Sequence, residues 1–252
     1  MEWSDDGIVL GARLYGEGAV IVNLITRGHG RHAGLVRGGS GVRARGIYEP
    51  GNRVRAVWRA RLAEHLGHYT CELVEACAAR HFDDPLRLAV LSAATAVAEA
   101  VLPEREPHSG LYESLQRLLL DLDATDNENA AAYVRWEVEL LAELGFGLDL
   151  GACTVTGATE DLVYVSPRSG RAVSRDAGAP YGERLLRLPA FLLGGGPADR
   201  SDIRAGLKLT GFFLDRYVFA PARPAGDLGG ERAGHTPPAR DRLVARIGRL
   251  NA

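Results

Sequence analysis

Short β-branched runs separated by glycine turns occupy the first 80 residues and restrict this part of the chain to an all-β fold. Gly16-Glu17-Gly18 and Arg27-Gly28-His29-Gly30 are two of the turn sequences. The runs span 7–15, 19–26, 31–37, 52–62 and 69–74. Five short strands at intervals of about ten residues predict a small barrel or a sandwich.

From Pro85 onwards the hydrophobic spacing becomes that of helices. The first helix is alanine-rich and ends before Pro103, and the third has Asp126 or Asn127 as its cap and Gly145 as its stop. The proline- and glycine-rich stretch 221–238 is typical of a linker. The predicted helices span 85–102, 109–122, 127–144, 182–193, 201–220 and 240–250.

Charge is unevenly distributed, although the formal net charge is only −2. Residues 1–80 carry a net charge of +3, residues 81–150 one of −10, and residues 151–252 one of +5. A step of this size near residue 80 indicates a domain boundary.

Composition excludes several classes of protein. A chain that is 46% apolar and 25% charged is neither disordered nor collagen-like. No apolar run is long enough to span a membrane, and the acidic start 1–6 lacks a signal-peptide pattern. Three cysteines are too few for a disulfide framework. We therefore expect a cytoplasmic protein without a membrane partner.

Arginine dominates the segment between Arg27 and Arg61, where Glu49 is the only acid. In the run 52–62, the arginines share one parity with Val57, and the inward parity is that of Val54, Ala56, Trp58, Ala60 and Leu62. Because strand side chains alternate, this run predicts one inward face and one face with four adjacent arginines. Such a face favours binding of a phosphate backbone, and a merely solvated basic face is the alternative.

Aromatic residues near the arginines could stack on bases, although Trp58 has the parity of the core. Tyr48 and Tyr69 are the other candidates. The glycine-rich stretch 38–41 lacks the ending of a P-loop, and no helix clearly follows it, so a flexible basic hairpin loop is expected.

Metal and catalytic motifs are weak. The spacing of His65, His68, Cys71 and Cys77 matches no common metal site. Cys153-Thr-Val-Thr156-Gly157 has the outline of a zinc knuckle whose second ligand is threonine, and 169–177 has serine and alanine where a second pair would lie. One cysteine cannot hold tetrahedral zinc, so a metal-free, knuckle-like loop is predicted.

Catalysis is also not indicated, because paired acids such as Glu137 and Glu139 have the pattern of solvated helix faces. No nucleophile elbow, zinc-protease motif or dinucleotide fingerprint is present. We therefore expect a protein that is not an enzyme.

An ordered series of motifs resembles the RecO family of bacterial recombination mediators, in its alphaproteobacterial form. The series covers residues 1–220 and is specific only as a whole. It comprises Trp3-Ser-Asp-Asp-Gly-Ile-Val-Leu-Gly11, Tyr15-Gly-Glu-Gly18, 26–38, Leu102-Pro-Glu-Arg-Glu-Pro107, 143–149, the knuckle from Cys153, and 164–173.

The resemblance implies an α+β fold: an N-terminal five-stranded OB-fold β-barrel, then an α-helical domain with a degenerate zinc-knuckle-like loop region. It implies binding of single- and double-stranded DNA, annealing of complementary strands, and a place in the RecF pathway near the nucleoid. The implied protein partners are RecR, the C-terminal tail of single-strand-binding protein and, indirectly, RecA. No cofactor is expected, because only Cys153 remains of the four zinc ligands.

Together these inferences give a list of predictions. The expected DNA-binding residues are Arg31, Arg37, Arg43, Arg45, Arg53, Arg55, Arg59 and Arg61. The expected domains are an OB-fold (1–80), a helical domain (81–150), a knuckle-like insertion (151–180), helices that complete the helical domain (181–220), and a linker with a terminal helix (221–252). An OB-type adaptor for RNA or another polyanion is the alternative, and a phosphodiesterase-like enzyme is a third.

Overall fold

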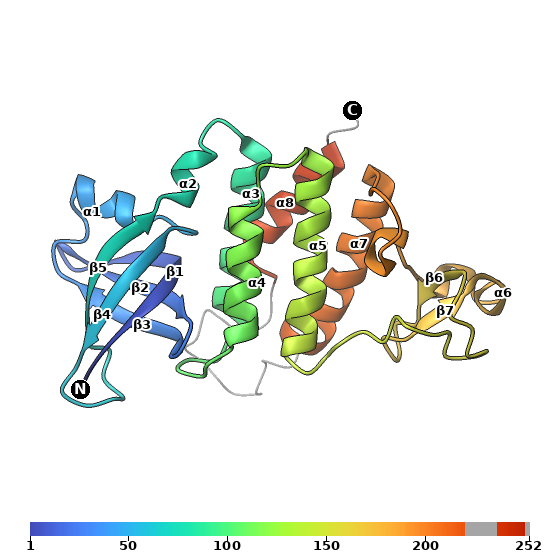
Figure 1. Cartoon of the computed structure of the whole chain (residues 1–252), viewed down its shortest axis with the longest axis horizontal. Coiled ribbons are helices and arrows are strands. Elements are labelled where there is room, and N and C mark those ends of the chain that lie inside the picture. The colour runs from blue at the N-terminus through green and yellow to red at the C-terminus, as the bar shows by residue number, and fades with distance from the viewer. Residues whose placement is uncertain (220–235, 250–252) are drawn as a thin grey trace. The chain divides into compact units, whose positions relative to one another are not determined.

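The computed structural model describes residues 1–219 and 236–249 (Figure 1). The chain forms two compact units. The first contains Met1–Leu122 with Pro237–Arg240, and the second contains Asp123–Thr236 with the C-terminal segment from Asp241. The domain limits that were inferred from charge stay predictions.

Five strands at the amino terminus close into a barrel in the order β1-β2-β3-β5-β4. All neighbouring pairs are antiparallel except the short parallel contact of β3 with β5. This five-stranded order, with a short helix α1 between β3 and β4, is the OB-fold arrangement that the resemblance implies. The elements are β1 (Glu2–Tyr15), β2 (Ala19–Thr26), β3 (Gly30–Val36), α1 (Val42–Ile47), β4 (Arg53–Arg59) and β5 (His68–Glu75).

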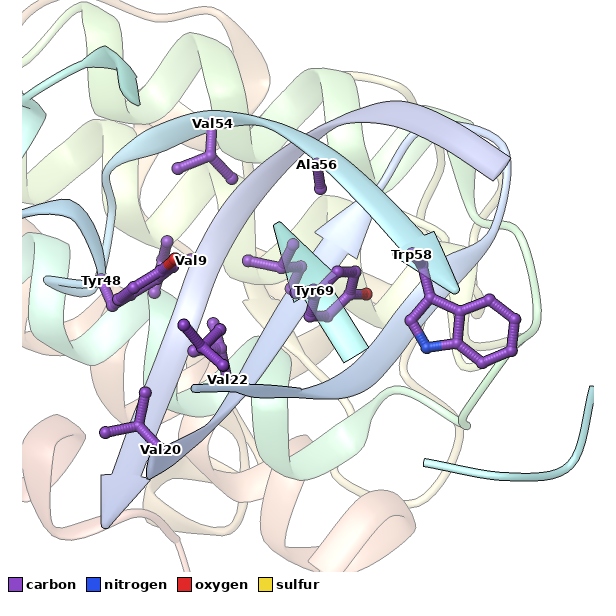
Figure 2. Close-up of a cluster of buried hydrophobic side chains, with 10 residues drawn as sticks. Val9, Val20, Val22, Tyr48, Val54, Ala56, Trp58 and Tyr69 are labelled. Atoms are coloured by element: carbon purple, nitrogen blue, oxygen red, sulfur yellow. The ribbon is translucent and has the colours of Figure 1, made fainter. Parts of the chain in front are cut away.

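Alternation on β4 builds the barrel core as predicted. Val54, Ala56 and Trp58 are buried and pack with residues of the other strands and with Tyr48. Figure 2 shows Val20 and Tyr48 at one end of this core and Trp58 at the other. The strand ends at Arg59, so the prediction that it continues to Leu62 is wrong: Leu62 lies in the following turn and is exposed.

Aromatic rings fill the Trp58 end of the barrel. Trp3 stacks on Trp58 with ring centroids 5.7 Å apart, and the ring of His32 meets Trp58 edge-on at 4.8 Å. The Trp58 indole donates to the carbonyl oxygen of Leu66. Gly67 has a φ of +65°, and a Cβ there would lie 2.4 Å from the indole nitrogen, so only glycine fits.

Helices of the first unit cover one outer face of the barrel. Asp84 caps α3 (Pro85–Val101) by accepting from two backbone amides, and Pro85 occupies the first turn. Asn23 of β2 donates to Glu99 of α3 at 2.6 Å. The outward-facing side chains of β2 are therefore buried. The other helices of this unit are α2 (Cys77–Arg80) and α4 (Ser109–Leu120).

The second unit contains the long helices α5 (Asp126–Glu143) and α7 (Arg200–Phe213). Thr125, not Asp126 or Asn127, caps α5 and forms a capping box with Glu128. Gly145 follows the end of this helix with a φ of +84°, as predicted. Glu137 was expected on a solvated face, but it is fully buried and accepts a hydrogen bond from Thr210 of α7.

A small sheet of order β7-β6-β8 completes this unit. The prediction of one helix over 182–193 is wrong, because Leu186 and Arg187 pair with β6 and Pro189 follows them. The remaining elements are β6 (Leu162–Val165), β7 (Ala172–Ser174), α6 (Arg175–Gly178), η1 (Gly182–Arg184), β8 (Leu186–Arg187), η2 (Ala190–Leu193), η3 (Leu214–Phe219) and α8 (Pro238–Arg249). The predicted linker 221–238 lies outside the described residues except for its last three.

Every helix within residues 1–219 and 236–249 is too short or too polar to cross a bilayer.

Protonation of His32 should destabilise the barrel. Burial lowers the pKa of His32 from 6.5 to about 4, and the ring lies within hydrogen-bond distance of the carbonyl oxygen of Ala33. The unfolded chain therefore takes up this proton more easily, so stability falls as the pH drops from 6.5 towards 4. We expect a loss of about 1 kcal/mol by about pH 5.5 that is absent in His32→Leu.

Urea unfolding followed by tryptophan fluorescence at neutral and mildly acidic pH measures this difference. His65→Leu, at an exposed histidine, is the control and should keep the wild-type pH dependence. Equal pH dependence in wild type and His32→Leu would contradict the assignment.

Candidate nucleic-acid interface

Three exposed arginines surround the short helix α1. Residues 38–41 form a turn, and α1 follows it directly, which corrects the expectation that no helix follows the glycine-rich stretch. Arg37 precedes the turn, and Arg43 and Arg45 lie on the helix. No carboxylate of the described residues pairs with any of the three. We call Arg37, Arg43 and Arg45 the α1 arginines.

The arginines of β4 have acidic partners on the neighbouring strands. Arg55 contacts Asp6 of β1 at 2.6 Å, and Arg59 contacts Glu2 of β1 at 2.8 Å. Arg53 contacts Glu75 of β5 at 2.9 Å. The predicted row of four adjacent arginines is therefore three on the strand, each with a carboxylate beside it.

The four paired arginines of the predicted set differ in how freely they can change partner. The side chains of Arg55 and Arg59 are 57% and 64% exposed, and ion pairs in water are worth little, so a phosphate can replace the carboxylate. Arg53 is 23% exposed. Arg31 is only 13% exposed, donates to the carbonyl oxygen of Leu102 and pairs with Glu104. The guanidinium groups of Arg31 and Arg53 are thus engaged by partners within the fold.

Arg61 lies in the turn between β4 and β5. This turn is held by hydrogen bonds from Arg105, which the sequence analysis did not predict. The guanidinium of Arg105 donates to the carbonyl oxygens of Ala63, Glu64 and His65 at 2.6–3.1 Å. Its backbone has a positive φ of 63°, which a non-glycine residue rarely adopts. No sequence pattern signals such a long-range contact, because its acceptors are backbone atoms.

A pocket of about 340 Å³ opens beside the α1 arginines. β1, β2, the glycine-rich turn and α1 contribute its walls. Tyr48 lines it and is itself part of the barrel core (Figure 2). The full lining is Ala12, Leu14, Val20, Gly39, Arg45, Tyr48, Glu49 and Pro50.

Of the aromatic candidates for base stacking, Trp58 is core, as its parity predicted, and Tyr69 is equally buried. Tyr48 is buried as well, with 6% of its surface exposed, but part of it lines the pocket. Burial raises its pKa, so it stays a neutral phenol.

Cys153 lies in the knuckle-like loop, where the backbone amide and hydroxyl of Ser174 point at its sulfur at 3.3 Å and 3.4 Å. Burial raises the pKa of this thiol, but hydrogen bonds from Ser174 and Thr156 outweigh it and lower the pKa to about 6. Ser174 and Thr156 thus lie at two positions where the knuckle outline predicts zinc ligands, and Ala177, at a third, has no ligand atom in its side chain.

One thiol and two hydroxyls do not fit a tetrahedral zinc site. Within the described part of the chain, no group of three metal-binding side chains comes together, at the knuckle or around His65, His68, Cys71 and Cys77. The absence of a cofactor stays a prediction.

Comparison with known proteins places the whole chain in one family. The model of the family described as "Recombination protein O N terminal" matches residues 1–77, and that described as "Recombination protein O C terminal" matches residues 83–224. A Rhodospirillum centenum protein called DNA repair protein RecO is 53% identical over 249 residues, which are 98% of this chain and 94% of the relative.

Two further relatives carry the same name. The Rhodospirillum rubrum protein is 50% identical over 100% of this chain and 98% of its own length. The Rhodopseudomonas palustris protein is 53% identical over 88% of this chain and 90% of its own length. On the strength of both family models and these nearly full-length similarities, the chain belongs to the RecO family of recombination proteins.

Proposed function

We propose that this chain is a DNA-binding recombination mediator of the RecF pathway that acts in DNA repair. It binds single- and double-stranded DNA, anneals complementary strands, and helps RecA to load onto DNA coated by single-strand-binding protein. Family membership supports the role in repair. The observation that supports a DNA surface is the group of exposed α1 arginines on an OB-fold barrel, which have no carboxylate partner in the part of the chain that the structure describes.

The arrangement of side chains ranks the eight predicted contacts. The α1 arginines bind phosphates first, because all three lie within nine residues of the chain and no carboxylate of the described residues must be displaced from any of them. Arg61 adds a contact in the β4–β5 turn, and Arg55 and Arg59 join when phosphates replace Asp6 and Glu2. Arg31 and Arg53 keep their internal partners and make no direct contact.

Burial of the outer face of β2 strengthens this ranking. OB-folds commonly bind oligonucleotides over strands 2 and 3 and the adjoining loops. Here α3 packs over β1 and β2, and Asn23 is tied to Glu99. The loop side of the barrel near α1 stays accessible, as do the outer faces of β4 and β5.

Annealing follows from charge neutralisation. Contacts between guanidinium groups and phosphates position a strand without reading its sequence. When such contacts neutralise two complementary strands, their mutual repulsion falls and base pairing proceeds without a nucleotide cofactor. No catalytic step on DNA is part of this proposal.

Partner proteins are proposed to bind the second unit. The acidic, aromatic tail of single-strand-binding protein needs an apolar floor and a cation. The exposed guanidinium of Arg135 on α5 supplies such a cation; it lies 5.2 Å from the ring centre of Phe191 in η2, which is itself buried and holds the arginine in place. RecR is a further proposed partner.

Removing the α1 arginines should weaken DNA binding and its salt dependence together. In the double variant Arg43→Gln/Arg45→Gln, we expect affinity for single-stranded DNA to fall about tenfold or more. The slope of log affinity against log salt should shrink by about 1.4, since each lost single-strand phosphate contact removes about 0.7. Fluorescence anisotropy at several salt concentrations measures both quantities.

The matched control is Arg171→Gln/Arg175→Gln, which removes the same charge from two arginines that pair with Asp149 and Asp161. It should bind DNA nearly as wild type does. Unchanged affinity and slope in the α1 variant would overturn the proposed surface. Tighter binding of structured RNA or heparin than of DNA would favour the polyanion adaptor instead.

Strand annealing should depend on the same residues. Wild-type protein is expected to speed annealing of labelled complementary strands, both bare and coated by single-strand-binding protein, whereas Arg43→Gln/Arg45→Gln anneals them several-fold more slowly. Activity on bare strands only would reject the mediator role. Cleavage of labelled DNA with magnesium or manganese would reject the non-enzymatic account.

A further inference from the structure

The pocket beside α1 combines an apolar wall with two opposite charges. Leu14, Val20 and Tyr48 contribute apolar surface, and Arg45 and Glu49 stand among the lining residues. Arg45 and Glu49 are four positions apart along the chain, yet no ion pair joins them, and no side-chain partner for either is found among the described residues. Both charged groups are thus available to a ligand.

Glu49 is the only acid between Arg27 and Arg61. A carboxylate at this place repels a phosphate backbone and weakens general binding of a polyanion. Other acids near the basic segment neutralise arginines, as Glu2 and Asp6 do, but Glu49 does not. Its exposed carboxylate can instead accept hydrogen bonds from a group that carries N–H donors and no phosphate.

A nucleobase with an exocyclic amino group has the complementary chemistry. A base is flat and apolar on its faces and carries its donors at the edge, where a glutamate accepts from an amino group. The pocket volume of about 340 Å³ is large enough for one base and part of its sugar. Arg45, which lines the pocket, can bind a phosphate next to that nucleotide.

We infer that this pocket takes up one amino-bearing base of a single DNA strand, with Glu49 accepting from its amino group and Arg45 binding an adjacent phosphate. The inference rests on the proposed DNA-binding function and adds a base-binding subsite to it. Thymine fits poorly, since it carries a carbonyl oxygen at the ring position where cytosine carries its amino group, and this oxygen repels a carboxylate. A paired base in a duplex cannot enter, because its edge and faces are already occupied.

Two homopolymers of equal length separate this subsite from general phosphate binding. Oligo-dC and oligo-dT have the same backbone and the same six-membered ring; they differ at the amino edge and in the C5-methyl group of thymine. The full chain should bind oligo-dC about fivefold or more tightly than oligo-dT in anisotropy titrations near neutral pH. Glu49→Gln should bind oligo-dT more tightly than wild type does and should lose most of the preference, since an amide both accepts and donates.

Glu64→Gln is the matched control, because it removes the same charge from an exposed glutamate in the β4–β5 turn. It should keep the preference for oligo-dC. Equal binding of the two homopolymers by wild type, or a preference that survives Glu49→Gln, would overturn the subsite.

A second variant tests insertion itself. Ala12→Tyr places a ring in the pocket and should weaken single-strand binding several-fold while duplex binding stays unchanged; an equal effect on both would count against a base in the pocket.

The proposed function fails separately, if Arg43→Gln/Arg45→Gln leaves binding of both homopolymers intact. Loss of binding in that variant without any base preference would retain the function and reject the subsite.

Discussion

Antiparallel pairing of β1 with β4 is the constraint on which the rest of the amino-terminal unit depends. It closes the barrel, and it sets Glu2 opposite Arg59 and Asp6 opposite Arg55 in the strand register. Those acids partly neutralise the arginines that would otherwise repel one another along β4. The same closure leaves the glycine-rich turn and α1 between β3 and β4 on the outside, where Arg37, Arg43 and Arg45 keep their charge for a ligand.

Much of the fold could be predicted from local sequence patterns. Alternation on β4 identified Val54, Ala56 and Trp58 as core, and Gly145 marked the end of α5, because each depends on neighbours close in the sequence. Contacts between distant segments were not predictable in this way. The sequence around Glu137 is typical of a solvated helix face. The hydroxyl of Thr210, 73 residues further along the chain, nevertheless donates a buried hydrogen bond to its carboxylate. The helix predicted over 182–193 failed because pairing of β8 with β6 outweighs local helix preference.

The candidate site shows the same division. The concentration of arginine between residues 27 and 61 was visible in the sequence, but the partner of each guanidinium was not. Eight arginines of similar appearance fall into three groups: internally held, exchangeable and unpaired. Only the fold reveals that Arg31 donates to the carbonyl oxygen of Leu102, just after α3, and that Arg105 donates to backbone carbonyl oxygens of the β4–β5 turn. Counting charges therefore identified the basic segment but not which of its guanidinium groups pair with carboxylates.

The most direct test of the account is a hydrogen–deuterium exchange map of the full chain with and without single-stranded DNA. Because the three α1 arginines have no carboxylate partner among the described residues and need displace no acid, we predict that DNA slows exchange chiefly over residues 37–49, with a smaller effect at the β4–β5 turn. Protection confined to the outer face of β2, or to the second unit, with no change at residues 37–49, would contradict the central claim.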